Sequence, residues 1–289
     1  CPRESKIKAQ FHNPATDAAL QVGFLTFHRA DTVVSHAWDE KRGIGALAAW
    51  CDFAGWELGA GESTETEVFT LSCGTDPCAA LESWADHVAR ITPMRVWEET
   101  PLGWVGWAWV DPFTVERYED VVVRNAAAIS RRLKGFGLRY IWVSIGNLKD
   151  GIPGNWLDWN TETSPHGNEW LVQRLNEHGI KLGFWAGAFW MCPWAEQSMA
   201  HLADALLPDE AGKPVVARSE WQYGKAGLAK KADRPPIYAP DPSKPKGLAF
   251  RRKVFETWRK GGVRYYMIDF LHAARGSIST HPHGPHHHK

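Results

Sequence analysis

Residues 137–143 read GLRYIWV, and the pattern of this stretch returns as GIKLGFW at 179–185 and as GVRYYMI at 262–268. Each copy has a glycine, then a branched residue, a cation and an apolar run. Glycine is suited to the left-handed backbone that ends many helices. The apolar runs leave no solvated face, which is typical of buried parallel strands. The repeat therefore predicts helices that alternate with parallel strands.

Four such strands are predicted, at about 103–110, 138–145, 180–188 and 263–270. Thr114 is suited to cap a helix whose apolar face contains Tyr118, Val122, Ile129 and Leu133, and shorter helices are expected at 168–178 and 248–260. A (β/α)8 barrel needs eight strands and about 250 residues. The predicted fold class is α/β, with only the first half of a TIM-type barrel in residues 96–289.

Residues 1–95 have a different pattern. Short segments such as 22–27 and 65–71 alternate polar and apolar residues between turn-forming residues, which favours an antiparallel sheet. Residues 78–91 carry apolar side chains at helical spacing, and Pro93 and Pro101 follow them. We therefore expect a domain boundary near residue 95, after a linker helix.

Composition limits the classes of partner. The chain has 33 basic and 33 acidic residues, so it offers no positive field for nucleic acid or for a membrane surface. Its 17 tryptophans suit stacking on sugar rings, although filling a core is the alternative for any one of them. The five cysteines have no paired zinc spacing. We expect a carbohydrate partner, no cofactor and no metal; oligomeric state and localisation stay open.

The candidate site follows from the barrel, because catalytic residues of this fold lie at the carboxyl ends of the strands. Asp269 ends an apolar strand, where a carboxylate is costly unless it is hydrogen-bonded or used, so it is the catalytic candidate. Substrate-binding candidates at the other strand ends and loops are Trp107, Asp111, Asn147, Trp156, Trp185, Trp190 and His272. Two carboxylates among aromatic side chains would suit glycoside hydrolysis. Cys192 is interpreted as a buried thiol rather than a nucleophile.

Several motifs resemble the α-galactosidase-like glycoside hydrolases of family 36 and its clan. They are GWVGW at 103–107, GNW at 154–156, SPHG at 164–167, GIKLGFW at 179–185 and MIDF at 267–270. The resemblance implies retaining cleavage of a neutral glycoside with Asp269 as the nucleophile. It also implies that residues 1–95 are the C-terminal part of a β-sandwich domain with its linker helix.

The chain departs from the family pattern at three places. Residues 143–147 lack the acids usual after the second strand, Met267 stands where a lysine is usual, and Asn155 replaces an aspartate. These departures favour the alternative of a non-catalytic carbohydrate-binding relative; a barrel of unrelated activity is the third reading. The resemblance places the acid/base beyond residue 289, so we expect a partial chain with little activity alone.

Overall fold

The computed structural model describes residues 3–41, 43–53, 56–92, 97–105, 117–209 and 211–271. The chain forms two compact units, one extending to residue 96 and the other starting at residue 97. Each unit has its own sheets, and each is described separately below. Within the described residues, no helix is both long and apolar enough to span a bilayer.

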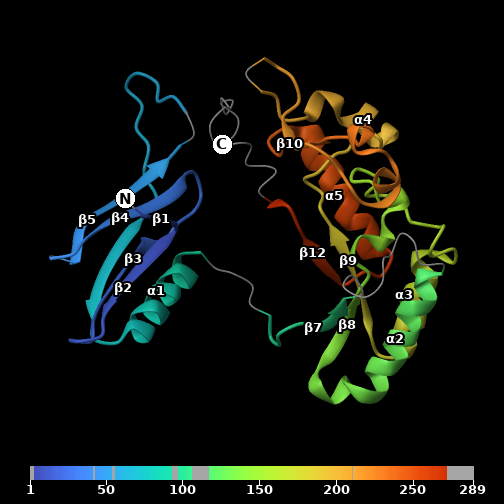
Figure 1. Cartoon of the computed structure of the whole chain (residues 1–289), viewed down its shortest axis with the longest axis horizontal. Coiled ribbons are helices and arrows are strands. Elements are labelled where there is room, and N and C mark those ends of the chain that lie inside the picture. Colours follow the sequence, from blue (N-terminus) through green and yellow to red (C-terminus); the bar gives the residue numbers. More distant parts are fainter. Residues whose placement is uncertain are drawn as a thin grey trace. The chain divides into compact units, whose positions relative to one another are not determined.

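The first unit contains two antiparallel sheets of three strands (Figure 1). One sheet has the order β1-β4-β5, with β1 at Arg3–Lys6, β4 at Asp31–Asp39 and β5 at Gly43–Asp52. The other has the order β2-β3-β6, with β2 at Lys8–Asn13, β3 at Ala18–Phe24 and β6 at Phe69–Gly74. Val22, Phe24 and Val34 form a buried cluster with residues from both sheets. The alternating segments predict antiparallel pairing, and the β-sandwich that the family resemblance implies is confirmed.

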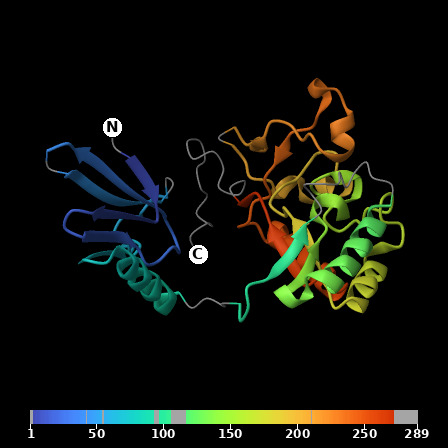
Figure 2. The same ribbon diagram turned by 60° about the horizontal axis from the view of Figure 1, so that its bottom comes forward.

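Helix α1 (Pro77–Ile91) lies along the β2-β3-β6 sheet (Figure 2). It begins at Asp76, whose carboxylate accepts hydrogen bonds from the backbone N–H groups of Cys78 and Ala79. Trp84 packs directly on Gly23, where a Cβ atom would lie 2.6 Å from the indole nitrogen. The glycine therefore allows the helix to approach the central strand of the sheet.

The second unit is built on four parallel strands in the order β7-β8-β9-β12. They are β7 (Leu102–Val105), β8 (Leu138–Trp142), β9 (Lys181–Ala186) and β12 (Tyr265–Ile268). All three pairings are parallel, and each strand lies beside the next one predicted from the sequence. The glycines of the repeat, Gly137, Gly179 and Gly262, have φ of 84°, 69° and 96°. The predicted half-barrel and its left-handed helix ends are confirmed.

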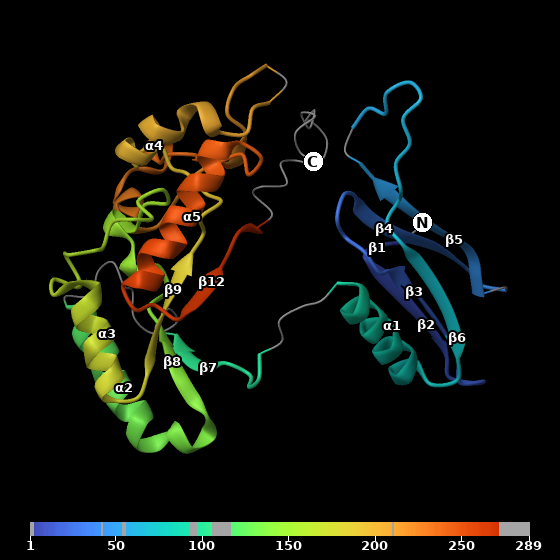
Figure 3. The same ribbon diagram turned by 180° about the vertical axis from the view of Figure 1, so that it is seen from behind.

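Three helices lie along one face of this sheet (Figure 3). They are α2 (Tyr118–Arg132), α3 (Gly167–Glu177) and α5 (Pro245–Lys260). Tyr118, Val122 and Ile129 are buried, as the predicted apolar face requires. Leu133 is an exception to that prediction, because it follows the last residue of α2 and is exposed. The proposed cap Thr114 lies outside the described residues.

A long excursion separates β9 from α5 and explains why the last two repeats are far apart in the sequence. It contains α4 (Glu196–Leu202) and two short antiparallel strands, β10 (Val216–Arg218) and β11 (Ile237–Tyr238). Single 3-10 turns in this unit are at Lys134–Phe136, Ser144–Asn147, Lys149–Gly151, Ala203–Ala205, Gly224–Leu228 and Lys231–Asp233. The excursion adds loops beside the sheet instead of a further parallel strand.

Candidate active site

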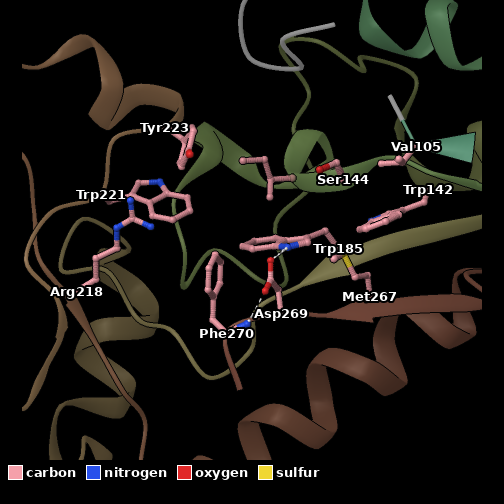
Figure 4. Close-up of a pocket in the computed structure, with 11 residues that line it drawn as sticks. Val105, Trp142, Ser144, Trp185, Arg218, Trp221, Tyr223, Met267, Asp269 and Phe270 are labelled. Carbon is pink, nitrogen blue, oxygen red and sulfur yellow. Dashed lines mark hydrogen bonds between the residues drawn. The ribbon is translucent and has the colours of Figure 1, made fainter. Parts of the chain in front are cut away.

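A pocket of about 310 Å³ lies at the carboxyl ends of the parallel strands (Figure 4). Its lining residues come from all four strands or the turns after them, and from the excursion between β9 and α5. They are Val105, Trp142, Ser144, Ile145, Trp185, Arg218, Trp221, Tyr223, Met267, Asp269 and Phe270. Aromatic and aliphatic side chains dominate the lining, with a few polar groups among them, as is usual for sites that bind small molecules.

Asp269 follows the last residue of β12, is half-buried and lines the pocket. Its Oδ2 accepts a hydrogen bond of 3.1 Å from the indole N–H of Trp185, and its Oδ1 accepts one of 2.8 Å from the backbone N–H of Phe270. Phe270 has φ of 57°, a left-handed backbone that is costly for a residue with a Cβ. The turn thus ends the strand at Asp269, and the N–H of Phe270 helps to fix the orientation of the Asp269 carboxylate.

Aromatic rings surround Asp269 on the side of the excursion. Phe270 stacks on Trp190, with ring centroids 3.6 Å apart and planes within 10°. The ring planes of Trp185 and Phe270, and those of Trp190 and Trp221, are nearly perpendicular to each other. The rings are locked by this packing, so the pocket presents flat apolar surfaces in fixed positions.

Hydrogen bonds from indole groups to backbone oxygens hold this aromatic cluster in place. Trp156 donates to the backbone oxygen of Trp190 over 3.0 Å, and Trp221 donates to Gly151 over 2.8 Å. Unlike Trp185 and Trp221, neither Trp156 nor Trp190 lines the pocket. Trp156 packs against Trp185 and Trp190 against Phe270, so both support the lining, and their role as sugar-contacting residues stays a prediction.

The remaining candidates are placed as follows. Trp185 lines the pocket beside Asp269, as expected. Asn147 is buried and does not line the pocket, because the chain turns at Ser144 (φ 46°) into a 3-10 turn; its Oδ1 has no hydrogen-bond partner among the described residues. Trp107, Asp111 and His272 lie outside the described residues and keep only their sequence-based assignment.

Several lining residues were missed by the sequence analysis, chiefly Arg218, Trp221 and Tyr223. They belong to the excursion, whose strands are too short to show any periodicity. The only signal was the interval between the second and third repeats, which is nearly twice the interval between the first and second. Trp142 was missed because it falls inside the strand predicted at 138–145, whereas β8 ends at this residue.

Among the described residues that line the pocket, Asp269 is the only carboxylate. The described part of the chain also has no group of three or more histidine, cysteine, aspartate or glutamate side chains arranged to hold a metal ion. The pocket as described therefore offers a nucleophilic oxygen, an arginine, two hydroxyl groups and aromatic surfaces.

No protein-family model matches the sequence. The fold, however, is that of solved α-galactosidases. TtGalA, the α-galactosidase from Thermus thermophilus in complex with p-nitrophenyl α-D-galactopyranoside, superposes with a TM-score of 0.66 at 19% identity, over 94% of this chain and 46% of that one. A variant of the family 36 α-galactosidase AgaA from Geobacillus stearothermophilus, in complex with 1-deoxygalactonojirimycin, gives a TM-score of 0.66 at 15% identity, over 92% and 36%. The α-galactosidase from Lactobacillus brevis gives 0.60 at 15% identity, over 92% and 36%.

These likenesses confirm the fold expected from the motifs: an antiparallel β-sandwich part and a partial TIM-type barrel. This chain spans half or less of the length of the α-galactosidases it matches. At this level of identity the likeness concerns the fold, and the chemistry has to be argued from the pocket.

Proposed function

We propose that this chain carries the nucleophile of a retaining glycoside hydrolase, with residues 96–289 as the first half of its catalytic barrel and residues 1–95 as the end of its β-sandwich domain. The observation that carries the proposal is the placement of Asp269 at the carboxyl end of β12, lining an aromatic pocket with both carboxylate oxygens hydrogen-bonded. Barrel enzymes keep their catalytic side chains at this edge of the sheet.

In this mechanism a carboxylate oxygen of Asp269 attacks the anomeric carbon as the bond to the leaving group breaks, and water later hydrolyses the glycosyl ester. The hydrogen bonds from Trp185 and Phe270 hold the carboxylate in one orientation, which reduces the entropy lost on reaching the transition state. Each oxygen keeps further lone pairs for the attack, because each accepts only one described hydrogen bond.

The substrate class follows from the aromatic lining and from the fold. Flat rings of Trp185 and Trp221 suit the apolar faces of a sugar ring. TtGalA has been solved with p-nitrophenyl α-D-galactopyranoside and with stachyose, so α-galactosides are the first substrates to test here. Met267 in the lining cannot hydrogen-bond a sugar hydroxyl strongly, so a preference for galactose over its epimers is not part of the proposal.

Retaining hydrolysis requires a second carboxyl group about 5 Å from the nucleophile, to protonate the leaving oxygen. The described lining does not contain one. Because the chain spans about half of the matched α-galactosidases, we assign this acid/base to the half of the barrel that this chain does not contain.

The competing proposal is a carbohydrate-binding relative without catalysis. The specific observation in its favour is the pocket with a single described carboxylate and with Met267 beside it. Binding alone would need the aromatic surfaces but not the nucleophilicity of Asp269. The two proposals therefore differ in whether Asp269 can form a covalent bond to a sugar.

Trapping with 5-fluoro-α-D-galactosyl fluoride separates them. Fluoride leaves without being protonated, so this reagent tests the nucleophile without the missing acid. We expect a mass increase on the peptide that contains Asp269, absent in Asp269→Asn and present in the matched control Asp158→Asn, whose carboxylate is exposed. Sugar binding without any label on Asp269 would instead support the non-catalytic relative.

A further inference from the structure

Arg218 places a cationic group in the pocket that the proposed hydrolysis does not use. It ends β10, is half-buried and lines the pocket together with Asp269. Its guanidinium carbon lies 5.9 Å from the ring centroid of Trp190 and 5.8 Å from that of Trp221. Figure 4 shows the guanidinium beside the Trp221 ring. The two indoles hold the arginine head without neutralising its charge.

The guanidinium has no described partner for its five N–H groups. Within the residues that the structure describes, its contacts are those with the rings of Trp190 and Trp221, and it forms no hydrogen bond or ion pair. Five other arginines of the same unit have such partners, namely Arg117, Arg139, Arg174, Arg234 and Arg264. Arg251 also has a buried Nη1 without a described partner, but among the described arginines Arg218 is the one that lines this pocket. Arg218 thus keeps its donors available at the pocket.

A half-buried and pre-oriented guanidinium is suited to a planar anion. Its donors form a fork that matches the two oxygens of a carboxylate, and such charge-assisted pairs are stronger than bonds to neutral hydroxyl groups. A neutral sugar would leave this charge partly desolvated and poorly paired, which costs binding free energy. The rest of the described lining has few side chains that can hydrogen-bond the hydroxyl groups of a sugar, namely Ser144 and Tyr223.

We propose that Arg218 binds a carboxylate of the substrate, so that the preferred ligand is an acidic glycoside. This inference rests on the proposed function and narrows the neutral glycoside implied by the sequence motifs. The carboxylate would lie at the Arg218 end of the pocket, away from Asp269, because two carboxylates repel each other. The carboxylate could belong to a uronic acid ring or to the aglycone, and the test separates these sources.

Binding is measured by quenching of tryptophan fluorescence, with two matched pairs of probes. The first pair is methyl α-D-galactosiduronate and methyl α-D-galactoside, which tests the sugar ring. The second pair is 4-carboxyphenyl α-D-galactoside and phenyl α-D-galactoside, which tests the aglycone. We expect at least one acidic probe to have a Kd about tenfold or more below that of its neutral twin, the range given by a hydrogen bond to a charged group.

Three variants assign the preference. Arg218→Met should abolish it, Arg218→Lys should retain part of it because the charge stays while the fork is lost, and Arg252→Met on the exposed face of α5 should leave it unchanged. If near-UV circular dichroism shows that Arg218→Met does not fold, the inference is tested with Arg218→Lys alone, whose preference for the acidic probe should be smaller than that of the wild type. Equal Kd values within both probe pairs, or a preference that survives in both Arg218 variants, would overturn the inference.

The outcome is independent of the trapping experiment. A label on Asp269 combined with no preference for acidic probes leaves the hydrolase and removes the role of Arg218. An Arg218-dependent preference without any label keeps the carboxylate site and removes the nucleophile.

Discussion

Trp185 donates its indole N–H to Oδ2 of Asp269 across 3.1 Å, although 84 residues separate them in the chain. The contact is a product of strand register, because β9 and β12 are parallel neighbours in which Trp185 pairs with Met267, two residues before Asp269. The parallel pairing that defines the half-barrel therefore also places the indole N–H of Trp185 at the carboxylate of Asp269. Fold and proposed chemistry depend here on one pair of strands.

Replacing Trp185 by Phe should impair the reaction of Asp269 more than it impairs folding. Phe keeps an aromatic ring in the cluster but removes the N–H that orients the carboxylate. We expect the rate of labelling by 5-fluoro-α-D-galactosyl fluoride to fall roughly 10- to 100-fold, the range for a hydrogen bond to a charged group. The measurement is the labelling rate by mass spectrometry at saturating reagent.

The matched control is Trp194→Phe, because Trp194 is exposed and does not line the pocket. Its labelling rate should equal that of the wild type. A Trp185→Phe variant that reacts at the wild-type rate would show that the backbone bond from Phe270 is sufficient to orient Asp269.

Gly224 fixes the excursion against the loop after β8, and its replacement should release that side of the pocket. Its φ is 58°, and an added Cβ would clash with the backbone oxygen of Asp150 and lie 2.7 Å from the Cα of Gly151. We expect Gly224→Ala to lower the free energy of unfolding by about 2–4 kcal/mol, combining left-handed strain with overpacking. Urea unfolding followed by tryptophan fluorescence measures this loss.

Gly135→Ala is the control, because a Cβ there meets no atom within 4 Å. It should change the free energy of unfolding by less than about 1 kcal/mol. Comparable losses in both variants would argue that the contact between Gly224 and Gly151 does not hold the excursion in place.

Three of the four parallel strands, β8, β9 and β12, could be predicted because a local sequence signal precedes each of them. Gly137, Gly179 and Gly262 precede apolar runs, and a glycine with positive φ followed by such a run has few alternatives to a helix end and a strand. The position of Asp269 directly after β12 could be predicted in the same way, and its catalytic role stays a prediction. Periodicity and position were sufficient for these features.

The other side of the pocket could not be predicted, because nothing near it in the sequence determines its place. Strands β10 and β11 have three and two residues, too few for any period to be recognised. Trp221 is located by its hydrogen bond to the backbone of Gly151, 70 residues away. That Trp156 and Trp190 lie outside the lining could not be predicted for a related reason, since only the packed structure distinguishes a tryptophan that supports a pocket from one that lines it.

Glu67 should make the stability of the first unit depend on pH in the acidic range. Its Oε1 accepts backbone N–H bonds from His28, Arg29 and Ala30 at 2.9, 2.6 and 3.1 Å. Burial alone would raise the pKa of Glu67, but these bonds and the hydroxyl of Thr26 outweigh it, so the net pKa is below the ordinary 4.5. Because the pKa of Glu67 is lower in the folded protein than in the unfolded one, its carboxylate stabilises the fold at pH values above the unfolded pKa. This contribution is lost as the pH falls through the folded pKa.

We therefore expect Glu67→Gln to be less stable than the wild type by about 1 kcal/mol at pH 7, because the amide accepts the same bonds without the charge. The difference should shrink below pH 4.5 and vanish once the wild-type carboxyl is protonated. Urea titrations from pH 7 to pH 3 test this, with the exposed Glu65→Gln as control. A difference that is constant across this range would show that the charge of Glu67 does not contribute.

Cys192 should resist alkylation in the folded protein while two other cysteines react. Burial raises the pKa of the Cys192 thiol to about 11, with backbone hydrogen bonds from Trp194 and Ala195 opposing the shift, and the residue is fully buried. At pH 8 only about a thousandth of it is thiolate, the reactive form. Cys73 and Cys78 are exposed. Iodoacetamide at pH 8, followed by peptide mass spectrometry, should modify these two within minutes and Cys192 only after unfolding in urea. Equal rates at all three positions in the native protein would mean that the core around Cys192 opens as readily as the surface.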